Sequence, residues 1–157
     1  MTIMPPKKFY KKKSYGSYSK PSYSTSIGHT SYLIIVESPS KCQKIEGYLG
    51  GQYKCIASKG HFREIVGLKQ IAVRSNFEPS FSLVKEKSSH VSWMCDIIKQ
   101  YPKNAVFLAT DDDREGEGIA WHICDVFDLP IETTKRILFH EITQKAILDA
   151  VANPTTL

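Results

Sequence analysis

The sequence predicts an α/β fold in which helices cover both faces of a parallel sheet. Residues 32–37 (YLIIVE) and 105–110 (AVFLAT) are short apolar runs that carry no charge before their last position, as strands buried on both faces do. A segment with helical spacing follows each run. Alternating strands and helices favour a parallel sheet, because a crossover helix returns the chain to the edge where the previous strand began.

The first strand leads directly into a predicted helix. Ser38 is in place to cap this helix and Pro39 to begin it, so we expect it to run to about Leu49, where two glycines stop it. Residues 53–58 (YKCIAS) predict a second strand. Residues 59–89 contain glycines, a proline and little periodicity, so we expect loops there and a short strand.

The second half of the chain continues the alternation around the AVFLAT strand. Apolar residues at helical spacing predict helices over 90–101 and from 115 to about 127. Residues 136–140 (RILFH) predict a strand, and residues 143–152 a last helix with Thr143 at its N-cap. The sequence shows no internal repeat.

Composition limits the class of protein. The chain has 157 residues, of which 41% are hydrophobic and 24% charged, enough for one globular domain. No apolar run approaches the roughly 18–20 residues of a membrane span, and no secretory signal begins the chain, so we expect an intracellular protein without a membrane partner. The four cysteines form no CxxC pair, which argues against a zinc ribbon.

The basic charge is concentrated at the amino end. Residues 1–30 contain six lysines and no acidic residue, whereas the rest of the chain has 15 basic and 16 acidic residues. This segment has little aliphatic surface, so we expect a disordered tail. It would either solubilise or target the protein, or tether it to nucleic acid by stacking tyrosines on bases and neutralising phosphates with Lys7, Lys8, Lys11, Lys12 and Lys13.

Three predicted strands end in polar residues. Glu37 ends the first strand, Asp111 follows AVFLAT, and His140 with Glu141 follows RILF. Ligands of such sheets bind outside the carboxyl ends of the strands. We therefore expect one acidic site built from distant segments.

The acidic cluster after AVFLAT predicts a metal site. Asp111 and Asp113 would face the same side of an extended segment, and Asp112 would face away. Glu115 would lie at the N-terminus of the next helix. Such carboxylates repel one another unless a cation lies between them, and Mg²⁺ prefers oxygen ligands of this kind. The alternative is a solvated acidic loop at a helix N-terminus, where acids are favoured anyway.

Other single residues are less specific. Lys41 lies in the first turn of its helix, where lysine and free N–H groups can bind an anion, but it could equally be an ordinary surface lysine. Trp121 is most simply a core residue, and His122 belongs to the core or the surface rather than to catalysis. There is no GxxxxGK[ST] or GxGxxG segment, which excludes a P-loop and leaves dinucleotide binding unsupported.

Taken together and in order, these motifs resemble the Toprim domain of type IA DNA topoisomerases. The matching segments are VESPSK (36–41), KGH (59–61), ATDDDREGE (109–117) with IAWH (119–122), and FHEIT (139–143). The resemblance covers about residues 32–153 and is nearest to the bacterial topoisomerase I branch, which includes enzymes of large DNA viruses. It implies a Rossmann-like Toprim fold over residues 31–153, with residues 154–157 beginning a further domain.

The resemblance also implies roles for particular residues. Glu37 would take part in proton transfer and transition-state stabilisation at the scissile phosphate, and Lys41 and Arg114 would contact that phosphate. The implied Mg²⁺ ligands are Asp111, Asp113 and Glu115, and the implied DNA contacts include Lys59 and His61. Asp112 is assigned no role, and His140 stands where many bacterial members have asparagine.

The implied reaction is cleavage, passage and religation of a single DNA strand, which relaxes negative supercoils. Enzymes of this family use a tyrosine of a separate domain to form a 5′-phosphotyrosine bond, and none of the eight tyrosines here lies in a matching context. We therefore expect this chain to be part of an isomerase and to be inactive alone. It would act on single-stranded DNA together with tyrosine-bearing domains, supplied in cis or in trans. The alternatives are a stand-alone Toprim nuclease or primase-like protein, and a catalytically dead DNA-binding module.

Overall fold

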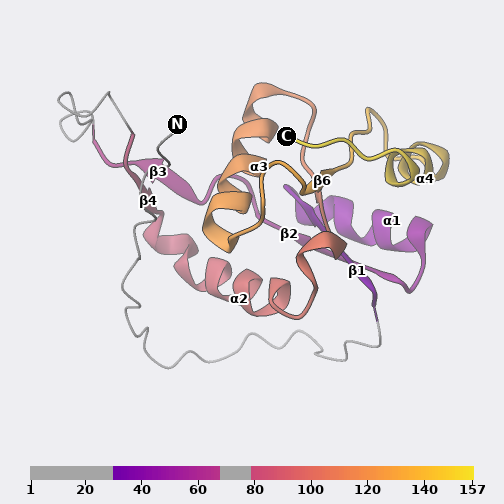
Figure 1. Cartoon of the computed structure of the whole chain (residues 1–157), viewed down its shortest axis with the longest axis horizontal. Helices are drawn as coiled ribbons and strands as arrows, with labels where there is room; N and C mark the ends of the chain where they lie inside the picture. Colours follow the sequence, from indigo (N-terminus) through magenta and orange to yellow (C-terminus); the bar gives the residue numbers. More distant parts are fainter. Residues whose placement is uncertain (1–29, 68–78) are drawn as a thin grey trace, which may run out of the picture.

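Four parallel strands form the centre of the computed structural model, which describes residues 30–67 and 79–157 (Figure 1). Their order across the sheet is β2-β1-β5-β6. The strands are β1 (Tyr32–Val36), β2 (Tyr53–Ala57), β5 (Val106–Ala109) and β6 (Lys135–Arg136). The chain leaves β1 toward one edge of the sheet and returns to β5 on its other side, so the strand order reverses between β1 and β5. In sheets of this type such a reversal is where ligands bind.

Helices cover both faces of the sheet, as predicted. On one face, Leu33 and Ile35 of β1 pack in a core cluster with buried residues of α2 (Ser88–Ile98) and α3 (Arg114–Phe127). On the other face, the alternate β1 residues pack with α1 (Pro39–Leu49) and α4 (Gln144–Ala152). This alternation follows from the two-residue period of a strand. It confirms the α/β class and explains why the strand runs are apolar throughout.

The helix starts confirm one of the two predicted capping residues, Thr143, and add Asp113, which was not predicted as a cap. Asp113 caps α3 by accepting a hydrogen bond from the Gly116 N–H at 2.7 Å, and Thr143 caps α4. Ser38 has the extended backbone of an N-cap, but its hydroxyl bonds the Ser40 hydroxyl at 2.8 Å and makes no cap bond. Proline at the start of α1 has a fixed φ that suits the first helical position.

The segment between β2 and α2 differs from the prediction. Two short strands, β3 (Arg63–Ile65) and β4 (Phe81–Leu83), pair antiparallel and stand apart from the main sheet (Figure 1). Trp121 of α3 lies against this hairpin and is 38% exposed, so the expectation of a core tryptophan was wrong. The reason is that the hairpin covers only part of the indole. Among the described residues, two 3₁₀ turns, η2 (Lys85–Lys87) and η3 (Lys103–Ala105), lie in the connections.

The last strand is shorter than the predicted 136–140. β6 ends at Arg136, the Ile137 N–H still bonds the Leu108 carbonyl at 2.8 Å, and the chain then leaves the sheet. As the edge strand, β6 has on its outer side a single antiparallel bridge, between Arg136 and Thr155. Residues 154–157, which we expected to begin a further domain, thus contact this sheet.

The predicted basic tail, with its five candidate DNA-binding lysines, lies outside the described residues. Within residues 30–67 and 79–157, none of the helices is both long enough and apolar enough to cross a membrane.

Candidate active site

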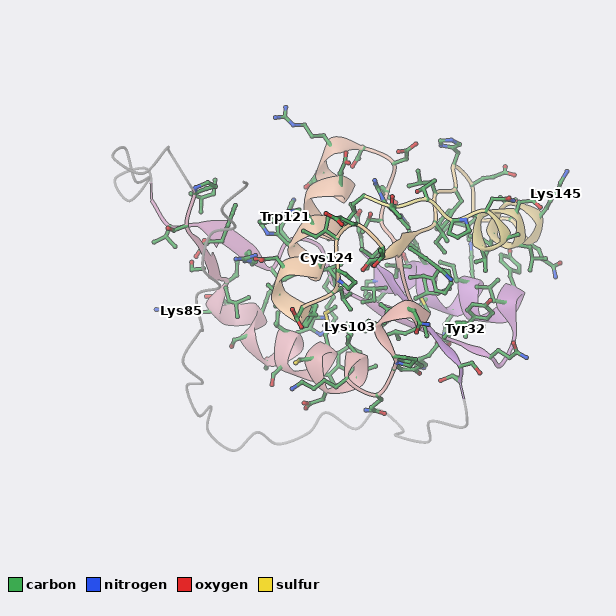
Figure 2. The ribbon with its side chains drawn as sticks, viewed as in Figure 1. Tyr32, Lys85, Lys103, Trp121, Cys124 and Lys145 are labelled. Carbon is green, nitrogen blue, oxygen red and sulfur yellow. The ribbon has the colours of Figure 1, made fainter. Side chains whose placement is uncertain are left out.

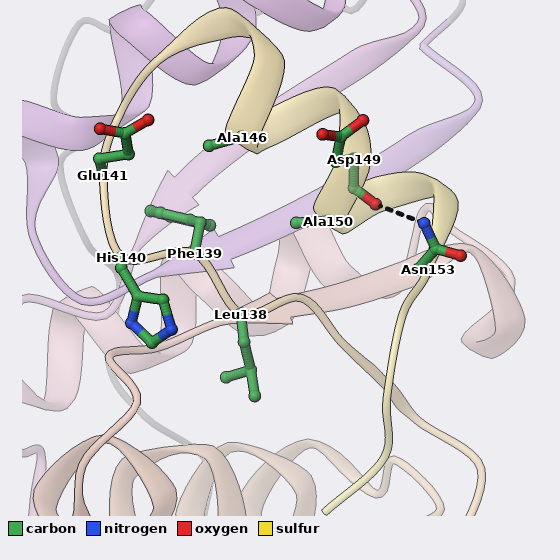
Figure 3. Close-up of a pocket in the computed structure, with 8 residues that line it drawn as sticks. All are labelled: Leu138, Phe139, His140, Glu141, Ala146, Asp149, Ala150 and Asn153. Carbon is green, nitrogen blue, oxygen red and sulfur yellow. Dashed lines mark hydrogen bonds between the residues drawn. The ribbon is translucent and has the colours of Figure 1, made fainter.

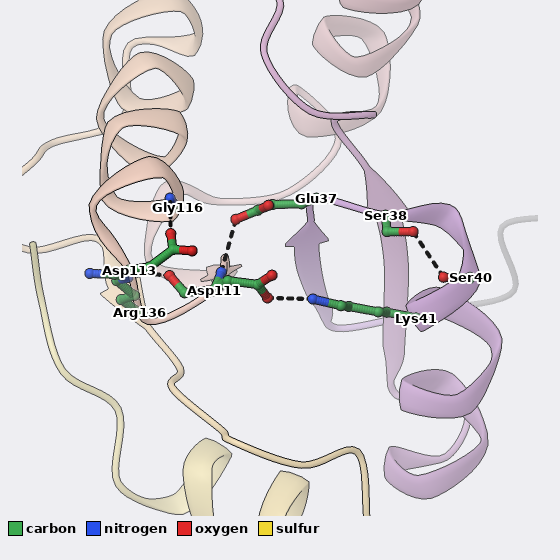
Figure 4. A network of polar contacts seen from close by, with 8 residues as sticks. All are labelled: Glu37, Ser38, Ser40, Lys41, Asp111, Asp113, Gly116 and Arg136. Atoms are coloured by element: carbon green, nitrogen blue, oxygen red, sulfur yellow. Dashed lines mark hydrogen bonds and ion pairs between the residues drawn. The ribbon is translucent and has the colours of Figure 1, made fainter.

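The carboxyl ends of β1 and β5 bring two distant acidic residues together. The strands are paired up to Val36 and Ala109, and the chain continues into Glu37 on one and Asp111 on the other. The Asp111 N–H donates a hydrogen bond to Glu37 Oε1 at 2.9 Å (Figure 4). A backbone bond of this kind fixes the position of the Glu37 carboxyl relative to the acidic segment. The predicted meeting of strand ends is therefore seen at this edge.

Lys41 joins the same group from α1. Its ammonium group forms an ion pair with Asp111 Oδ1 across the gap between α1 and the β5 end (Figure 4). The Lys41 side chain is 21% exposed and that of Asp111 50% exposed, so the pair opens to solvent on the carboxylate side. A lysine in the first helical turn, beside free N–H groups, can attract a phosphate. The site therefore combines a cation with two carboxylates.

The other members of the acidic motif point to different partners. The Asp113 carboxylate caps α3, and Glu115 Oε1 lies 2.9 Å from His61 Nε2. Arg114 begins α3 and is exposed, and no residue of the described ranges makes a hydrogen bond or ion pair with its side chain. The three acidic side chains thus lie on one short segment, but each interacts with a different group.

The KGH loop reaches the site in a left-handed conformation. Lys59 has φ 61° and Gly60 φ 77°, a backbone region that glycine adopts easily and lysine rarely. The Gly60 N–H donates to the Glu37 carbonyl at 3.3 Å, and Lys87 Nζ donates to the Lys59 and His61 carbonyls, each at 2.6 Å. Lys87 thus holds the loop that places His61 beside Glu115. No sequence pattern indicated Lys87, because its KEK context resembles any charged turn.

Arg136 is a second residue that sequence reasoning did not assign to the site. It is 5% exposed, and its NH2 group donates to the Asp111 carbonyl at 2.9 Å (Figure 4). Its Nε makes no hydrogen bond with any residue that the structure describes. This buried guanidinium therefore ties the backbone of the acidic segment to the edge strand of the sheet. No local pattern distinguishes it, because Lys135 and Arg136 form an ordinary basic pair before an apolar run.

An open pocket of about 390 Å³ lies at these strand ends. The residues that line it come from α1, the acidic segment and the FHEI segment: Lys41, Asp111, Asp112, Asp113, Phe139, His140, Glu141 and Ile142. His140 and Glu141 therefore reach the site as predicted. Asp112 also lines the pocket, so the expectation that it faces away was wrong, because the chain bends at Asp112 and Asp113 instead of staying extended.

A neighbouring pocket of about 620 Å³ lies between the FHE segment and α4 (Figure 3). It shares Phe139, His140 and Glu141 with the first pocket, but none of the acidic residues from 111 to 115 lines it. The FHE segment thus forms the wall between the two pockets.

The donor set fits Mg²⁺ by its chemistry. Asp111 and Asp113 present carboxylate oxygens to one pocket, and Mg²⁺ usually takes one or two carboxylates, with water and substrate phosphate completing its shell. Among the residues that the structure describes, no three His, Cys, Asp or Glu side chains are grouped to hold a metal ion. These side chains could therefore hold Mg²⁺ only if water and phosphate supply most of its ligands.

Two histidines beside the site are held toward their neutral form. Burial lowers the pKa of His90, whose Nε2 lies 2.7 Å from the Ala57 carbonyl, and Lys59 and Lys87 add to this effect. Burial also lowers the pKa of His122, assisted by the charge of Arg63. Neutral imidazole at both positions adds no charge to the site.

Comparison with known proteins identifies the fold. A family model described as "Toprim domain" matches residues 32–142. This chain belongs to the Toprim domain family. DNA topoisomerase 1 of Streptomyces coelicolor is 42% identical over 139 residues, which cover 80% of this chain and 14% of that protein. Full-length topoisomerase I of Thermotoga maritima superposes with a TM-score of 0.69 at 38% identity, covering 79% of this chain and 21% of that one.

These matches confirm the resemblance to bacterial topoisomerase I. The chain spans about a seventh of the Streptomyces protein and about a fifth of the Thermotoga chain. The likeness is therefore to the Toprim portion of these much longer proteins.

Proposed function

We propose that this Toprim domain provides the phosphate-binding and acid–base groups of a type IA DNA topoisomerase. In this proposal a tyrosine supplied by another segment, in cis or in trans, cleaves one DNA strand. The observation that carries the proposal is the contact between Glu37 and the Asp111 backbone, with Lys41 paired to the Asp111 carboxylate. It joins two distant motifs at the point where the strand order reverses.

Each group has a role that suits its position. Lys41 would bind the scissile phosphate, sharing its ammonium group between that singly charged phosphodiester and the Asp111 carboxylate. Arg114 is exposed, so it is free to contact the same phosphate as a fork of donors. Glu37 would hold or deliver the proton that the departing 3′ oxygen needs, provided it lies within hydrogen-bond reach of that oxygen.

Asp111, Asp113 and Glu115 would hold Mg²⁺ when DNA is bound. The metal would supply positive charge near the phosphate oxygens. The Asp111 carboxylate would then bind both Lys41 and the metal. The Asp113 carboxylate would bind both the metal and the Gly116 N–H that it caps. We expect weak binding by the chain alone, because the substrate phosphate that completes the shell is missing.

Metal binding can be tested on this chain by calorimetry. The Asp111→Asn, Asp113→Asn double variant should lose Mg²⁺ binding, and a Glu132→Gln variant at an exposed position should keep it. Asparagine can still cap a helix, so loss of binding would not reflect loss of α3. Unchanged binding in the double variant would refute the assignment of these ligands.

The reaction can be tested by mixing the chain with the tyrosine-bearing remainder of a related topoisomerase. Cleavage of a single-stranded oligonucleotide, with a covalent adduct on the added tyrosine, should require both parts and Mg²⁺. We expect the chain alone to leave supercoiled plasmid unrelaxed. Nicking by the chain alone without an adduct would instead favour a Toprim nuclease, and a mixture without cleavage would favour a DNA-binding module.

A further inference from the structure

A partly exposed aromatic surface lies where α3 meets the β3–β4 hairpin. Trp121, on the hairpin side of α3, is 38% exposed (Figure 2), and the ring of Phe81 lies 5.8 Å from it. The His122 ring lies 5.0 Å from Trp121 and 4.7 Å from Phe81. Two rings thus hold the indole in place, while more than a third of the tryptophan stays open to solvent.

Arg63 fastens the hairpin to α3 at this point. Its guanidinium lies 4.9 Å from the Phe81 ring centre and 6.0 Å from that of Trp121, and it forms an ion pair with Asp125. The Arg63 side chain is only 10% exposed. A cation over the faces of aromatic rings restrains them and strengthens their packing. The exposed part of Trp121 is therefore a rigid surface.

The hairpin side of Trp121 is more basic than acidic, whereas α3 itself carries Glu117 and Asp125 one turn before and after Trp121. The described part of the segment 59–87, which forms the hairpin and its flanks, contains two acidic residues, Glu64 and Glu86, and four basic ones, Lys59, Arg63, Lys85 and Lys87. Lys85 is exposed next to the hairpin (Figure 2). The exposed apolar side chains nearby are only Ile65 and Leu83 within the described residues of the hairpin. Such a surface suits a partner that has both phosphates and rings.

The aromatic surface lies within reach of the candidate active site along one helix. Trp121 is six residues after Glu115 on α3, which corresponds to roughly 9 Å of helix rise. This is about the rise of three stacked nucleotides at 3.4 Å each. A strand with a phosphate near the start of α3 could therefore present a nearby base to the indole.

We propose that Trp121, supported by Phe81 and Arg63, is a stacking surface for an unpaired base of a single DNA strand. The inference rests on the proposed function and adds a base contact to it. A second copy of the chain is less suited to this surface, because a stable interface buries about 1,200–2,000 Å², far more than these few side chains offer. Stacking on an aromatic ring tolerates any base, as expected where the strand is held without sequence preference.

The chain has two tryptophans, which makes the contact measurable in the full-length chain. In Trp93→Phe, fluorescence reports Trp121 alone, and in Trp121→Phe it reports Trp93, which stacks on His90 and packs against the core. Each variant is titrated with an oligothymidylate of about 12 nucleotides, within the site sizes of single-strand binders. We expect saturable quenching of Trp121 and little change in Trp93.

Affinity provides an independent measurement. Trp121→Ala should weaken oligothymidylate binding roughly 5- to 150-fold, as loss of one stacked base predicts, and Trp121→Phe should weaken it much less. The salt dependence should keep its slope in both variants, because stacking releases no counterions. Unchanged thermal unfolding of Trp121→Phe ensures that its result is not due to misfolding.

The outcomes separate this inference from the proposed function. Tight oligothymidylate binding with unquenched Trp121 and unchanged affinity of Trp121→Ala would overturn the stacking contact and leave the proposed function standing. Self-association of the chain that Trp121→Ala abolishes, with oligonucleotide affinity unchanged, would assign the surface to a second copy. No binding by any variant would count against DNA binding altogether, and against the stacking contact with it.

Discussion

Gly116 is the residue whose replacement should disturb the candidate site most through packing alone. A Cβ built on Gly116 would lie 2.2 Å from the Asp111 carbonyl oxygen and 2.8 Å from its nitrogen, whereas ordinary contacts begin at 3.4 Å. Both neighbours are backbone atoms, so they cannot rotate away. Gly116→Ala therefore forces α3 and the Asp111 segment apart by more than 1 Å, straining the Asp111–Glu37 and Arg136–Asp111 hydrogen bonds.

The size of the effect follows from two opposing contributions. Overpacking costs about 1–3 kcal/mol, and alanine in place of glycine within a helix gains up to about 1 kcal/mol. We expect a net loss of about 1–2 kcal/mol, which lowers Tm by roughly 2–8 °C for a chain of this size. Gly118→Ala, in the same helix with no atom within 4 Å of the added Cβ, is the matched control and should be as stable as wild type or more stable.

Thermal and urea unfolding of the two alanine variants, side by side, measure this difference. Amide NMR shifts of Asp111 and Glu37 should also move in Gly116→Ala and stay in place in Gly118→Ala. Equal stability of the two variants would refute the close approach of α3 to the acidic segment.

Three further predictions concern the cap, the histidine and the tail. Asp113→Ala should lower the free energy of unfolding by about 0.5–2 kcal/mol through loss of the α3 cap, whereas Asp113→Asn should retain most of it in urea titrations. The pKa of His90 is lowered in the folded state, so the unfolded chain takes up a proton first as pH falls below about 6.5. Stability should therefore be complete at neutral pH and decline toward pH 5, and His90→Gln should make that decline shallower in urea titrations across this range, whereas an identical decline would exclude His90 as a cause. Deleting residues 1–30 should reduce the log–log salt slope of single-stranded DNA binding by up to about 4, from six lysines at roughly 0.7 each, and an unchanged slope would favour a solubilising tail.

Much of the fold could be predicted because the apolar pattern specifies it directly. Continuous apolar runs such as 32–36 and 106–109 are buried on both faces, and Thr143 acts as the cap that its position indicated. The β3–β4 hairpin could not be predicted in the same way, because its strands have three residues each, too few to show a period. The end of β6 could not be predicted either, because it depends on which strands lie beside it, and this is set by tertiary structure.

The sequence predicted which residues lie at the candidate site better than it predicted which residues they bind there. Parallel topology alone places Glu37 beside Asp111, because both follow adjacent strands. The pairing of Glu115 with His61 depends on a left-handed turn at Lys59 and Gly60 that Lys87 holds, and no local pattern announces it. The same is true of Arg136, which is buried although β6 is an edge strand and which the distant Thr155 bridges on that edge.

Cleavage by the reconstituted enzyme is the decisive measurement for Glu37. Glutamine at position 37 can still accept the Asp111 N–H bond through its own Oε1, so Glu37→Gln removes the acid function with little change in structure. Mixed with the tyrosine-bearing remainder of a related topoisomerase, this variant should cleave a single-stranded oligonucleotide about 10²–10⁴-fold more slowly than wild type, while Mg²⁺ affinity stays nearly the same and Glu132→Gln cleaves normally. Cleavage by Glu37→Gln at the wild-type rate would contradict the assignment and place the proton on another residue.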